Sequence, residues 1–402
     1  MTQSGLIVRV AAKGEGATAD GRYVALAAPG DTLEADGTLT HGPDHVDPPC
    51  RHFPACGGCQ LQHLSERALA EYVHGRVVGA AKGQEIDPGE VPPAHLSPPQ
   101  TRRRATLHAQ AIGRRVVIGF REQGSHKTID MRECYILAPE LFALVAPLRD
   151  LLEGWADRKL AVDIDLTLSD QGVSVGLSGL KADDLKRTEA LLDFARDNAL
   201  ARLTLDNGYG PEGRWEPEPT TITLGGTAVS LPPGAFLQAT RDGEQTLADA
   251  AREWLAGAAT LADLFSGLGT FAFALAGPKT KVLAVEAARD AHLACQSAAR
   301  LHARPVHALH RDLFRNPLRI EELDRFAGVV LDPPRAGARE QVEQIAGSKV
   351  PRVVYISCNP ASWAKDAVTL IAGGYRLAAL RPVGQFRWST HVELASLFVR
   401  KA

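Results

Sequence analysis

The chain has 402 residues, of which 45% are hydrophobic and 23% are charged, and these values are typical of a globular protein with two or three domains. Its formal net charge of −2 excludes a protein that coats nucleic acid by bulk electrostatics, although a local basic surface is still compatible with it. No apolar run approaches the roughly 18–20 residues that span a bilayer, and the first residues lack signal-peptide character, so we expect a cytoplasmic protein without membrane contact.

The N-terminal quarter of the chain predicts a small β unit, a cysteine-rich loop and a helix. Residues 5–40 alternate apolar and polar side chains between glycines, which is typical of an antiparallel β unit. Residues 41–63 hold three cysteines among prolines and glycines, and this composition predicts a loop. The apolar spacing over residues 64–81 predicts an amphipathic helix with Ser65 as its N-cap. A proline-rich connector follows.

The remaining chain predicts two larger units. Short strands dominate residues 101–230, with helical stretches near 138–156 and 181–199 and a closing loop over 207–219, which favours an α+β domain on an antiparallel sheet. From about residue 231 strands alternate with helices, which favours an α/β domain with a doubly wound, mostly parallel sheet. The predicted domains are a small β unit (1–47), a cysteine-rich loop and helix (48–100), a central α+β domain (101–230) and a C-terminal α/β domain (231–402).

Basic side chains are concentrated at the start of the predicted central domain. Residues 101–132 contain eight of them against only Glu122 and Asp130, a net charge near +6 in a chain that is acidic overall. This segregation predicts a phosphate-binding face, with a solvated sheet face as the alternative. The basic residues are Arg102, Arg103, Arg104, Arg114, Arg115, Arg121, Lys127 and Arg132.

A glycine-rich turn opens the C-terminal domain. It lies in the segment 263–272 after an apolar strand and before a helix, where a ligand can approach backbone N–H groups. The next strand ends in Glu286, and a carboxylate there accepts hydrogen bonds from a ribose. The turn also fits the dinucleotide fingerprint G-x-G-x-x-A, so an NAD-linked enzyme is the rival. Asp263 before the first glycine favours S-adenosylmethionine instead.

Two later strand ends carry a thiol and a carboxylate. Cys358 follows an apolar strand and precedes Asn359-Pro360, which forces a turn at the carboxyl end of the strand, where α/β sheets place their sites. Asp332 ends the neighbouring strand before two prolines that stiffen the turn and direct its carboxylate at a ligand. These two strand ends favour a methyltransferase further.

Methylation at carbon 5 of a pyrimidine needs a covalent nucleophile and a base on either side of the ring. A thiolate that adds to carbon 6 makes carbon 5 electron-rich, and a base must later remove the carbon 5 proton. Cys358 can supply the thiolate, and a buried structural cysteine is the alternative that we adopt for Cys295. Glu393 is a candidate base, although a solvated carboxylate explains it equally well from the sequence.

With these residues the chain resembles the RNA 5-methyluridine methyltransferase family. Asp-x-Phe-x-Gly-x-Gly-Thr, Asp-Pro-Pro-Arg-x-Gly, Ser-Cys-Asn-Pro and His-Val-Glu occur in the family's order. The resemblance implies a Rossmann-like class I methyltransferase domain that methylates carbon 5 of an RNA uridine with S-adenosylmethionine. It makes Cys358 the nucleophile and Glu393 the base. The cofactor-binding residues that it implies are Gln238, Phe265, Thr270, Glu286, Asp312 and Asp332.

Four further cysteines fit the same resemblance. In a cytosolic protein such a cluster favours metal binding or catalysis over disulfides. Their spacing suits a zinc site and an iron–sulfur cluster about equally, since both take four thiolates. The neighbouring Gly57-Gly58 and the segment 60–63 match the cluster version in the family, so we expect a [4Fe–4S] cluster that holds the loop together. The implied metal ligands are Cys50, Cys56, Cys59 and Cys134.

The resemblance also implies that RNA is the partner, with monomer as the default state. The N-terminal β unit is similar to the small RNA-binding TRAM barrel but is shorter. Together with the four cysteines, this unit favours ribosomal RNA (23S rRNA) over transfer RNA as the substrate. A paired uridine must be flipped out to reach the thiol, and we hypothesise that Phe236 and Trp388 stack on it. Two other classes are an NAD-linked iron–sulfur oxidoreductase, which leaves Cys358 and Glu393 idle, and a non-catalytic RNA-binding protein.

Overall fold

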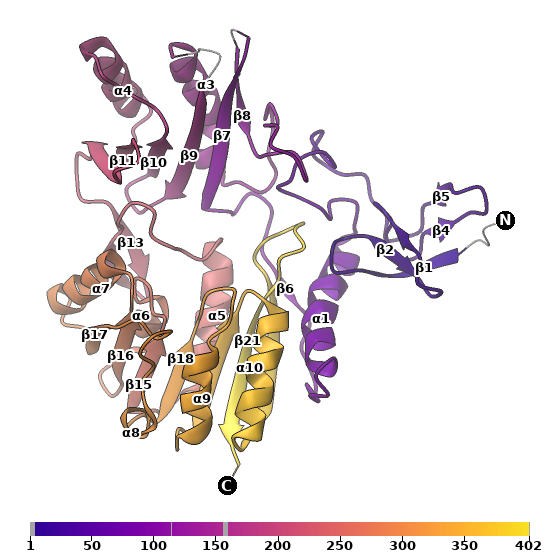
Figure 1. Cartoon of the computed structure of the whole chain (residues 1–402), viewed down its shortest axis with the longest axis vertical. Helices are drawn as coiled ribbons and strands as arrows, with labels where there is room; N and C mark the ends of the chain where they lie inside the picture. Colours follow the sequence, from indigo (N-terminus) through magenta and orange to yellow (C-terminus); the bar gives the residue numbers. More distant parts are fainter. Residues whose placement is uncertain (1–4, 114, 156–159, 402) are drawn as a thin grey trace.

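The computed structural model describes residues 5–113, 115–155 and 160–401. Two bodies lie one above the other, the central sheet above the C-terminal sheet, and the N-terminal β unit projects to one side (Figure 1). Predictions that involve residues 1–4, Arg114 or the helical stretch as far as residue 156 fall in part outside the described residues. No helix in the described ranges is long and apolar enough to cross a membrane.

The N-terminal unit is a five-stranded sheet with the order β3-β2-β1-β4-β5. All of its pairs are antiparallel, which confirms the predicted β unit. At Gly16 a Cβ atom would stand 2.7 Å from the Ala27 carbonyl oxygen, so this tight packing requires glycine. The strands are β1 (Gly5–Val10), β2 (Gly16–Thr18), β3 (Tyr23–Val24), β4 (Thr32–Leu33) and β5 (Leu39–Thr40).

Helix α1 (Glu66–Lys82) confirms the helix predicted over residues 64–81. The Ser65 side chain caps it by accepting a hydrogen bond from the Ala68 backbone N–H, at 3.1 Å. The helix packs against helix α10 (Pro360–Ala372) and strand β20 (Tyr375–Gly384) of the C-terminal body. It therefore ties the N-terminal part of the chain to that body.

The central sheet has the order β12-β11-β10-β9-β7-β8 and is antiparallel except between β10 and β11. The stretch predicted as one helix near 138–156 forms two helices that meet at Leu144. The loop predicted over 207–219 is wrong in part, because an exposed polar strand there pairs with β11 at the sheet edge. The elements are β7 (Arg104–Ile112), β8 (Arg115–Gly119), α2 (Pro139–Ala143), α3 (Val145–Glu153), β9 (Ala161–Leu168), β10 (Val173–Ser178), α4 (Leu185–Asp197), β11 (Arg202–Asp206) and β12 (Pro211–Trp215).

The C-terminal sheet has the order β17-β16-β15-β18-β19-β21-β20-β6. Its first five strands are parallel and β21 is antiparallel to both neighbours, which confirms the α/β, Rossmann-like fold. The proline-rich connector is more than a linker, since its strand β6 pairs with β20 at the edge. The strands are β6 (His95–Leu96), β15 (Thr260–Leu264), β16 (Lys281–Glu286), β17 (Val306–His310), β18 (Gly328–Leu331), β19 (Arg352–Ser357) and β21 (Glu393–Arg400); a separate hairpin is formed by β13 (Thr221–Leu224) and β14 (Thr227–Ser230).

Helices cover both faces of this sheet, which explains why its central strands are apolar throughout. Consecutive residues of β19 enter two different cores: Tyr355 packs with Trp363 of α10, and Ile356 packs with Leu247 of α5. Helices α9 and α10 lie in front of the sheet in Figure 1 and α5 lies behind it. The helices are α5 (Arg241–Trp254), α6 (Thr270–Leu275), α7 (Arg289–Leu301), α8 (Ile320–Leu323) and α9 (Arg339–Gly347).

Candidate active site

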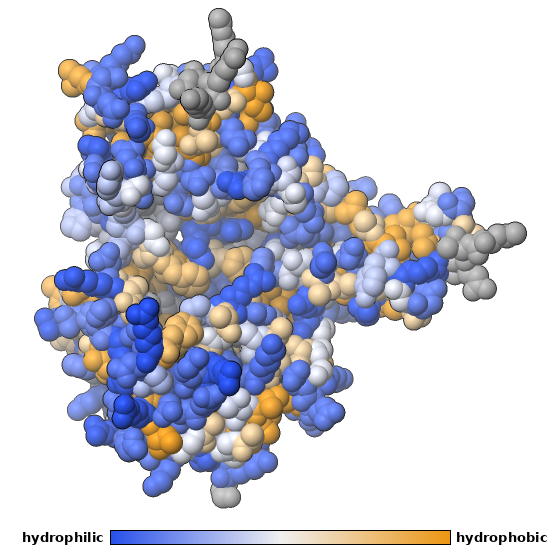
Figure 2. Space-filling view, in the orientation of Figure 1, coloured by the Kyte–Doolittle hydropathy of each residue, from blue (hydrophilic) through white to orange (hydrophobic). Residues whose placement is uncertain are grey.

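The predicted site residues meet at one edge of the C-terminal sheet. Strands β15, β18 and β19 are parallel neighbours, so the residues that follow them, Phe265, Asp332 and Cys358, emerge at the same edge. Strand β21 is antiparallel to β19 and begins with Glu393, whose neighbour Leu394 pairs with the last residue of β19. The sheet topology therefore brings the predicted nucleophile, base and cofactor residues together. Figure 2 shows a hollow between the central and C-terminal bodies, with apolar side chains at its floor.

The glycine turn after β15 is built for close backbone approach. Asp263 is fully buried, and its carboxylate accepts a hydrogen bond from the Ala272 backbone N–H at 2.7 Å, which fixes the start of α6. Gly269 has φ of 92°, and a Cβ there would lie 2.9 Å from the Cys295 sulfur, so only glycine fits. Cys295 is buried beneath this turn, which agrees with its structural assignment. Gly267 has φ of 54° and open space around its missing side chain.

Polar atoms at this turn fit the predicted cofactor. The Ser266 hydroxyl and one Asp263 carboxylate oxygen are buried, and neither has a hydrogen-bond partner among the described residues. Burial raises the pKa of Asp263 to about 8. The Glu286 carboxylate accepts hydrogen bonds from the backbone N–H groups of Gly267 and Ala288, at 2.8 and 2.6 Å, so it is held beside the turn where a ribose would lie.

The other predicted cofactor residues lie around the same turn. Thr270 is the first residue of α6, and Phe265 adopts a positive φ of 62°. Asp312 follows β17 and accepts a hydrogen bond from the Phe314 backbone N–H at 3.0 Å, so its carboxylate stabilises its own loop. The rings of Phe265 and Phe314 lie 5.3 Å apart. The sequence reasoning missed this aromatic partner.

A hydrogen-bonded chain of side chains connects Asp332 to Glu393. The Gln238 amide nitrogen donates to the Asp332 carboxyl group at 3.0 Å, and the Gln385 amide nitrogen donates to the Gln238 carbonyl oxygen at 2.7 Å. Gln385 also interacts with the Glu393 carboxylate and acts to lower its pKa. Sequence reasoning missed Gln385; its one signal is a polar residue directly after an apolar strand.

Burial controls the ionisation of this cluster. It raises the pKa of Glu393 to about 7, although Gln385 and Arg104 act in the opposite direction. Only 3% of Glu393 is exposed, so the solvated-carboxylate alternative is wrong. Burial, together with Glu393, raises the pKa of Asp332 well above its usual range. Cys358 is half-buried, and burial and both carboxylates raise its pKa to about 11.

The predicted basic face is split between buried and exposed groups. Arg103 is 2% exposed and donates hydrogen bonds to the Gln238 carbonyl oxygen and to the Glu244 carboxylate, so it is part of the site's support. The Arg104 guanidinium lies 4.5 Å from the ring centroid of Phe236. Arg103 therefore does not belong to an exposed basic face, whereas the phosphate-binding role of the exposed members stays a prediction. Of the described members of the cluster, Arg115, Arg121, Lys127 and Arg132 are exposed.

The two hypothesised stacking residues differ in exposure. Phe236 is 60% exposed, and its free ring surface is compatible with stacking on a base. Trp388 is only 8% exposed and belongs to the core, which leaves little ring surface for a ligand. Its backbone carbonyl oxygen accepts hydrogen bonds from the N–H groups of Gln60 and Leu61, so it anchors the cysteine-rich loop.

The four predicted metal ligands line one cavity. Cys50, Cys56, Cys59 and Cys134 share its wall with apolar side chains such as Phe120. Burial raises the pKa of all four thiols, that of Cys59 to about 12. Neighbouring backbone N–H groups act against this rise and lower the pKa of Cys50, Cys56 and Cys134. As they stand, no three His, Cys, Asp or Glu side chains of the described residues form a group that could hold a metal ion.

Comparisons with known proteins agree with this site. Residues 234–401 match the family model described as tRNA (Uracil-5-)-methyltransferase. The chain is 45% identical over 394 residues to an uncharacterized RNA methyltransferase of Zymomonas mobilis, covering 98% of this chain and 99% of that protein. It is 32% identical over 370 residues to 23S rRNA (uracil(1939)-C(5))-methyltransferase RlmD of Edwardsiella ictaluri, covering 90% and 83%.

A solved structure shares the whole fold. The crystal structure of Pyrococcus abyssi tRNA (uracil-54, C5)-methyltransferase in complex with S-adenosyl-L-homocysteine superposes with a TM-score of 0.78 and covers 99% of each chain. Only 20% of the aligned residues are identical, so this likeness concerns the fold. The arrangement of three bodies in Figure 1 is thus one that a solved protein also adopts.

Proposed function

The chain belongs to the RNA (uracil-5-)-methyltransferase family and uses S-adenosylmethionine, and on this premise we propose that it methylates uridine through a covalent adduct on Cys358. The observation that supports this mechanism best is the placement of a thiol and a buried carboxylate at one sheet edge, at Cys358 and Glu393. A nucleophile and a base on either side of a flat ring are what the chemistry needs. Neither rival class, the NAD-linked oxidoreductase or the non-catalytic binder, gives both groups a role.

The proposed reaction has two covalent stages. The Cys358 sulfur forms a bond to carbon 6 of the flipped uracil, and the ring electrons move to carbon 5. When bound, S-adenosylmethionine would supply the methyl group to carbon 5 and would leave as S-adenosylhomocysteine. Glu393 then takes the carbon 5 proton, the ring double bond returns, and the bond between sulfur and carbon 6 breaks. The thiolate leaves and the enzyme is regenerated.

Burial raises the pKa of both Glu393 and Cys358, which favours proton removal by Glu393 but opposes formation of the Cys358 thiolate. The raised pKa of Glu393, about 7, makes it a stronger base than an exposed carboxylate and leaves it partly ionised near neutral pH. The raised pKa of Cys358 opposes thiolate formation, and Arg335 partly offsets this effect. Protonation of Asp332, whose raised pKa favours the neutral form, removes one of the negative charges that face the thiol.

We further propose that the four cysteines of the shared cavity hold a [4Fe–4S] cluster. Four thiols that converge on one apolar cavity, with backbone N–H groups near the sulfurs, support such a site. The cluster would hold the cysteine-rich loop against the central sheet, since Cys134 comes from a distant segment. Protein purified without oxygen should contain iron and acid-labile sulfide, whereas one zinc ion per chain would contradict the cluster.

The proposed substrate is ribosomal RNA, bound by the N-terminal unit (1–47) and the central domain (101–230). The similarity to the RlmD protein supports this choice over transfer RNA. Nucleoside mass spectrometry on separated ribosomal and transfer RNA, from cells with and without the gene, tests both points. Loss of 5-methyluridine from ribosomal RNA alone is the expected result. Loss from transfer RNA would correct the substrate, and no loss in either pool, followed by no methylation by purified protein, would contradict the function.

A further inference from the structure

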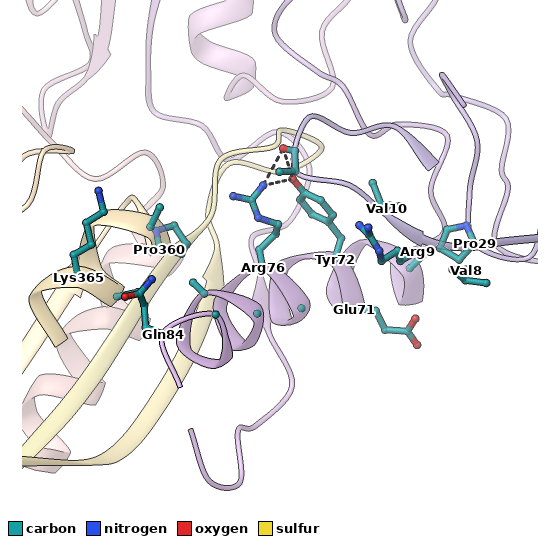
Figure 3. Close-up of a pocket in the computed structure, with 18 residues that line it drawn as sticks. Val8, Arg9, Val10, Pro29, Glu71, Tyr72, Arg76, Gln84, Pro360 and Lys365 are labelled. Carbon is teal, nitrogen blue, oxygen red and sulfur yellow. Dashed lines mark hydrogen bonds between the residues drawn. The ribbon is translucent and has the colours of Figure 1, made fainter. Parts of the chain in front are cut away.

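A groove of about 680 Å³ lies outside the site described above (Figure 3). Three separate elements form its walls: β1 and the chain after it, one face of α1, and the first turns of α10. Pro360, which lines the groove, is two residues from Cys358. The groove therefore comes within two residues of Cys358 along the chain and extends to the N-terminal unit.

The floor of the groove is a bare stretch of helix. Gly75 and Gly79 lie one turn apart on the exposed face of α1, and a Cβ built at either would meet no atom within 4 Å. Glycine inside a helix costs roughly 1 kcal/mol relative to alanine. No packing contact among the described residues requires glycine at either position. Because glycine has no side chain, both positions leave space above the helix for a ligand.

The charge of the groove is positive. Arg9 and Lys365 lie at its opposite ends in Figure 3, both are exposed, and neither forms an ion pair with a described residue. The acidic residue of the lining, Glu71, is already paired with Arg67 at 3.0 Å. Arg76 donates a hydrogen bond to the Ala12 carbonyl oxygen at 2.9 Å and serves to hold the wall. Two cations thus remain for a ligand.

We propose that this groove holds the RNA strand next to the target uridine, with Arg9 and Lys365 on its phosphates and the bare helix face under its sugars. The proposal rests on the proposed function, and it adds the path that the substrate follows. Phosphate contacts position a nucleic acid without reading its sequence, so the groove would set register while the active site selects the base.

Filling the groove tests this path. Gly79→Leu should preserve or raise the thermal stability, because leucine favours a helix over glycine, and should weaken RNA binding at least several-fold. Arg9→Glu with Lys365→Glu should weaken binding by about tenfold or more and lower the salt dependence by about one unit for each lost phosphate contact. The matched control is Lys281→Glu, an exposed lysine at the opposite, amino end of β16.

The measurement is filter binding of unmodified ribosomal RNA fragments without cofactor, so affinity is read even if no methyl transfer occurs. An RNA affinity that stays at the control value in both groove variants overturns the proposal. A failed proposed function would show instead as normal RNA binding by the unchanged protein and no methylated product in a parallel reaction that contains S-adenosylmethionine.

A second inference comes from Gln385, a side chain that is 2% exposed. Its carbonyl oxygen accepts a hydrogen bond from the Ala239 backbone N–H at 2.9 Å, and a backbone N–H can only donate. The amide cannot flip, so its nitrogen must face Gln238 and Glu393. A Cβ at Gly243 would lie 2.7 Å from the Gln385 Cβ, so the backbone of helix α5 packs closely against the Gln385 side chain and restricts its movement.

We infer that Gln385 is a positioning residue that holds the Glu393 carboxylate toward the uracil ring and orients the Gln238 amide toward Asp332. The Gln385 amide would thereby connect the proposed base, Glu393, to the predicted cofactor residues Gln238 and Asp332. This inference also rests on the proposed function, because it gives Gln385 a role only if Glu393 removes the proton.

Gln385→Leu is the test, with Gln341→Leu as the matched control. Gln341 is also buried, and its side-chain amide bonds to the backbone N–H and carbonyl oxygen of Leu318 and to no predicted site residue in the described chain. Gln385→Leu should slow breakdown of the Cys358–RNA adduct by up to about a hundredfold and move its pH midpoint upward, since Glu393 loses a donor. If Gln385→Leu does not fold, Gly243→Ala should give a smaller change of the same kind. The inference is overturned if the rate of adduct breakdown and its pH midpoint in Gln385→Leu equal those of the Gln341→Leu control. If the unchanged protein forms no adduct at all, the proposed function is refuted instead.

Discussion

The catalytic edge and the cysteine cavity both contain thiols whose pKa is raised by burial, yet their neighbours differ. Cys358 stands half-buried among carboxylates at a sheet edge that opens to a ligand, whereas Cys59 is buried among other thiols and apolar side chains. The first arrangement suits a nucleophile that forms and breaks one bond. The second suits ligands that stay bound. The comparison teaches that exposure and charged neighbours, more than residue type, determine which chemistry a cysteine performs.

Removing the two classes of thiol should therefore have different consequences, and the largest is expected at the catalytic edge. Cys358→Ala should lower methyl transfer by at least about 10⁴-fold, because no other group can form the covalent adduct, while leaving the fold unchanged. Product formation with S-adenosylmethionine and unmodified RNA measures this loss. The control Cys295→Ala should retain activity, since Cys295 packs beneath the glycine turn. Product formation by Cys358→Ala would refute the covalent mechanism.

The base at the catalytic edge should show a smaller effect with a distinct signature. Glu393→Gln should slow turnover by about 10²–10⁴-fold, because a neutral amide cannot take the carbon 5 proton. The methylated adduct between Cys358 and RNA should accumulate and appear as a slower band on a denaturing gel. Turnover loss without this band would mean that Glu393 acts before the adduct forms.

The cysteine cavity should respond through stability. Cys134→Ser should prevent binding of the proposed cluster and lower the free energy of unfolding by about 2 kcal/mol or more, because binding energy at a metal site is folding energy. Iron analysis and thermal unfolding of the purified variant measure both effects, with Cys295→Ala as the control that keeps its iron. A variant with full iron content would exclude Cys134 as a ligand.

The same comparison explains which parts could be predicted from the sequence. Asp332 and Cys358 end apolar strands, and parallel strands bring their carboxyl ends to one edge, so local motifs were enough to place them. Gln385 lies beside Glu393 only because β20 and β21 form an antiparallel pair, and no local pattern indicates that contact. Its role could be recognised only from the structure.

Burial was the other quantity that the sequence did not reveal. Arg103 stands in a run of three arginines that predicts a phosphate-binding face, but its side chain is buried, and Glu244 from helix α5 and the Gln238 carbonyl oxygen accept its hydrogen bonds. Strand β12 was missed because its glycine and polar residues are tolerated at an exposed sheet edge. In both cases distant partners overrode the local composition.

The pH dependence of the two covalent stages offers the finest test of the catalytic edge. Breakdown of the adduct needs ionised Glu393, so its rate should fall about tenfold per pH unit below the Glu393 pKa of about 7 and level off above it. Formation of the adduct needs the Cys358 thiolate, so its rate should keep rising above pH 7 toward the thiol pKa of about 11. Rapid-quench measurements of both stages between pH 6 and about pH 9 separate them. Parallel pH profiles would mean that one ionisation controls both stages. In that case Glu393 and Cys358 would not each control a separate stage through their own pKa.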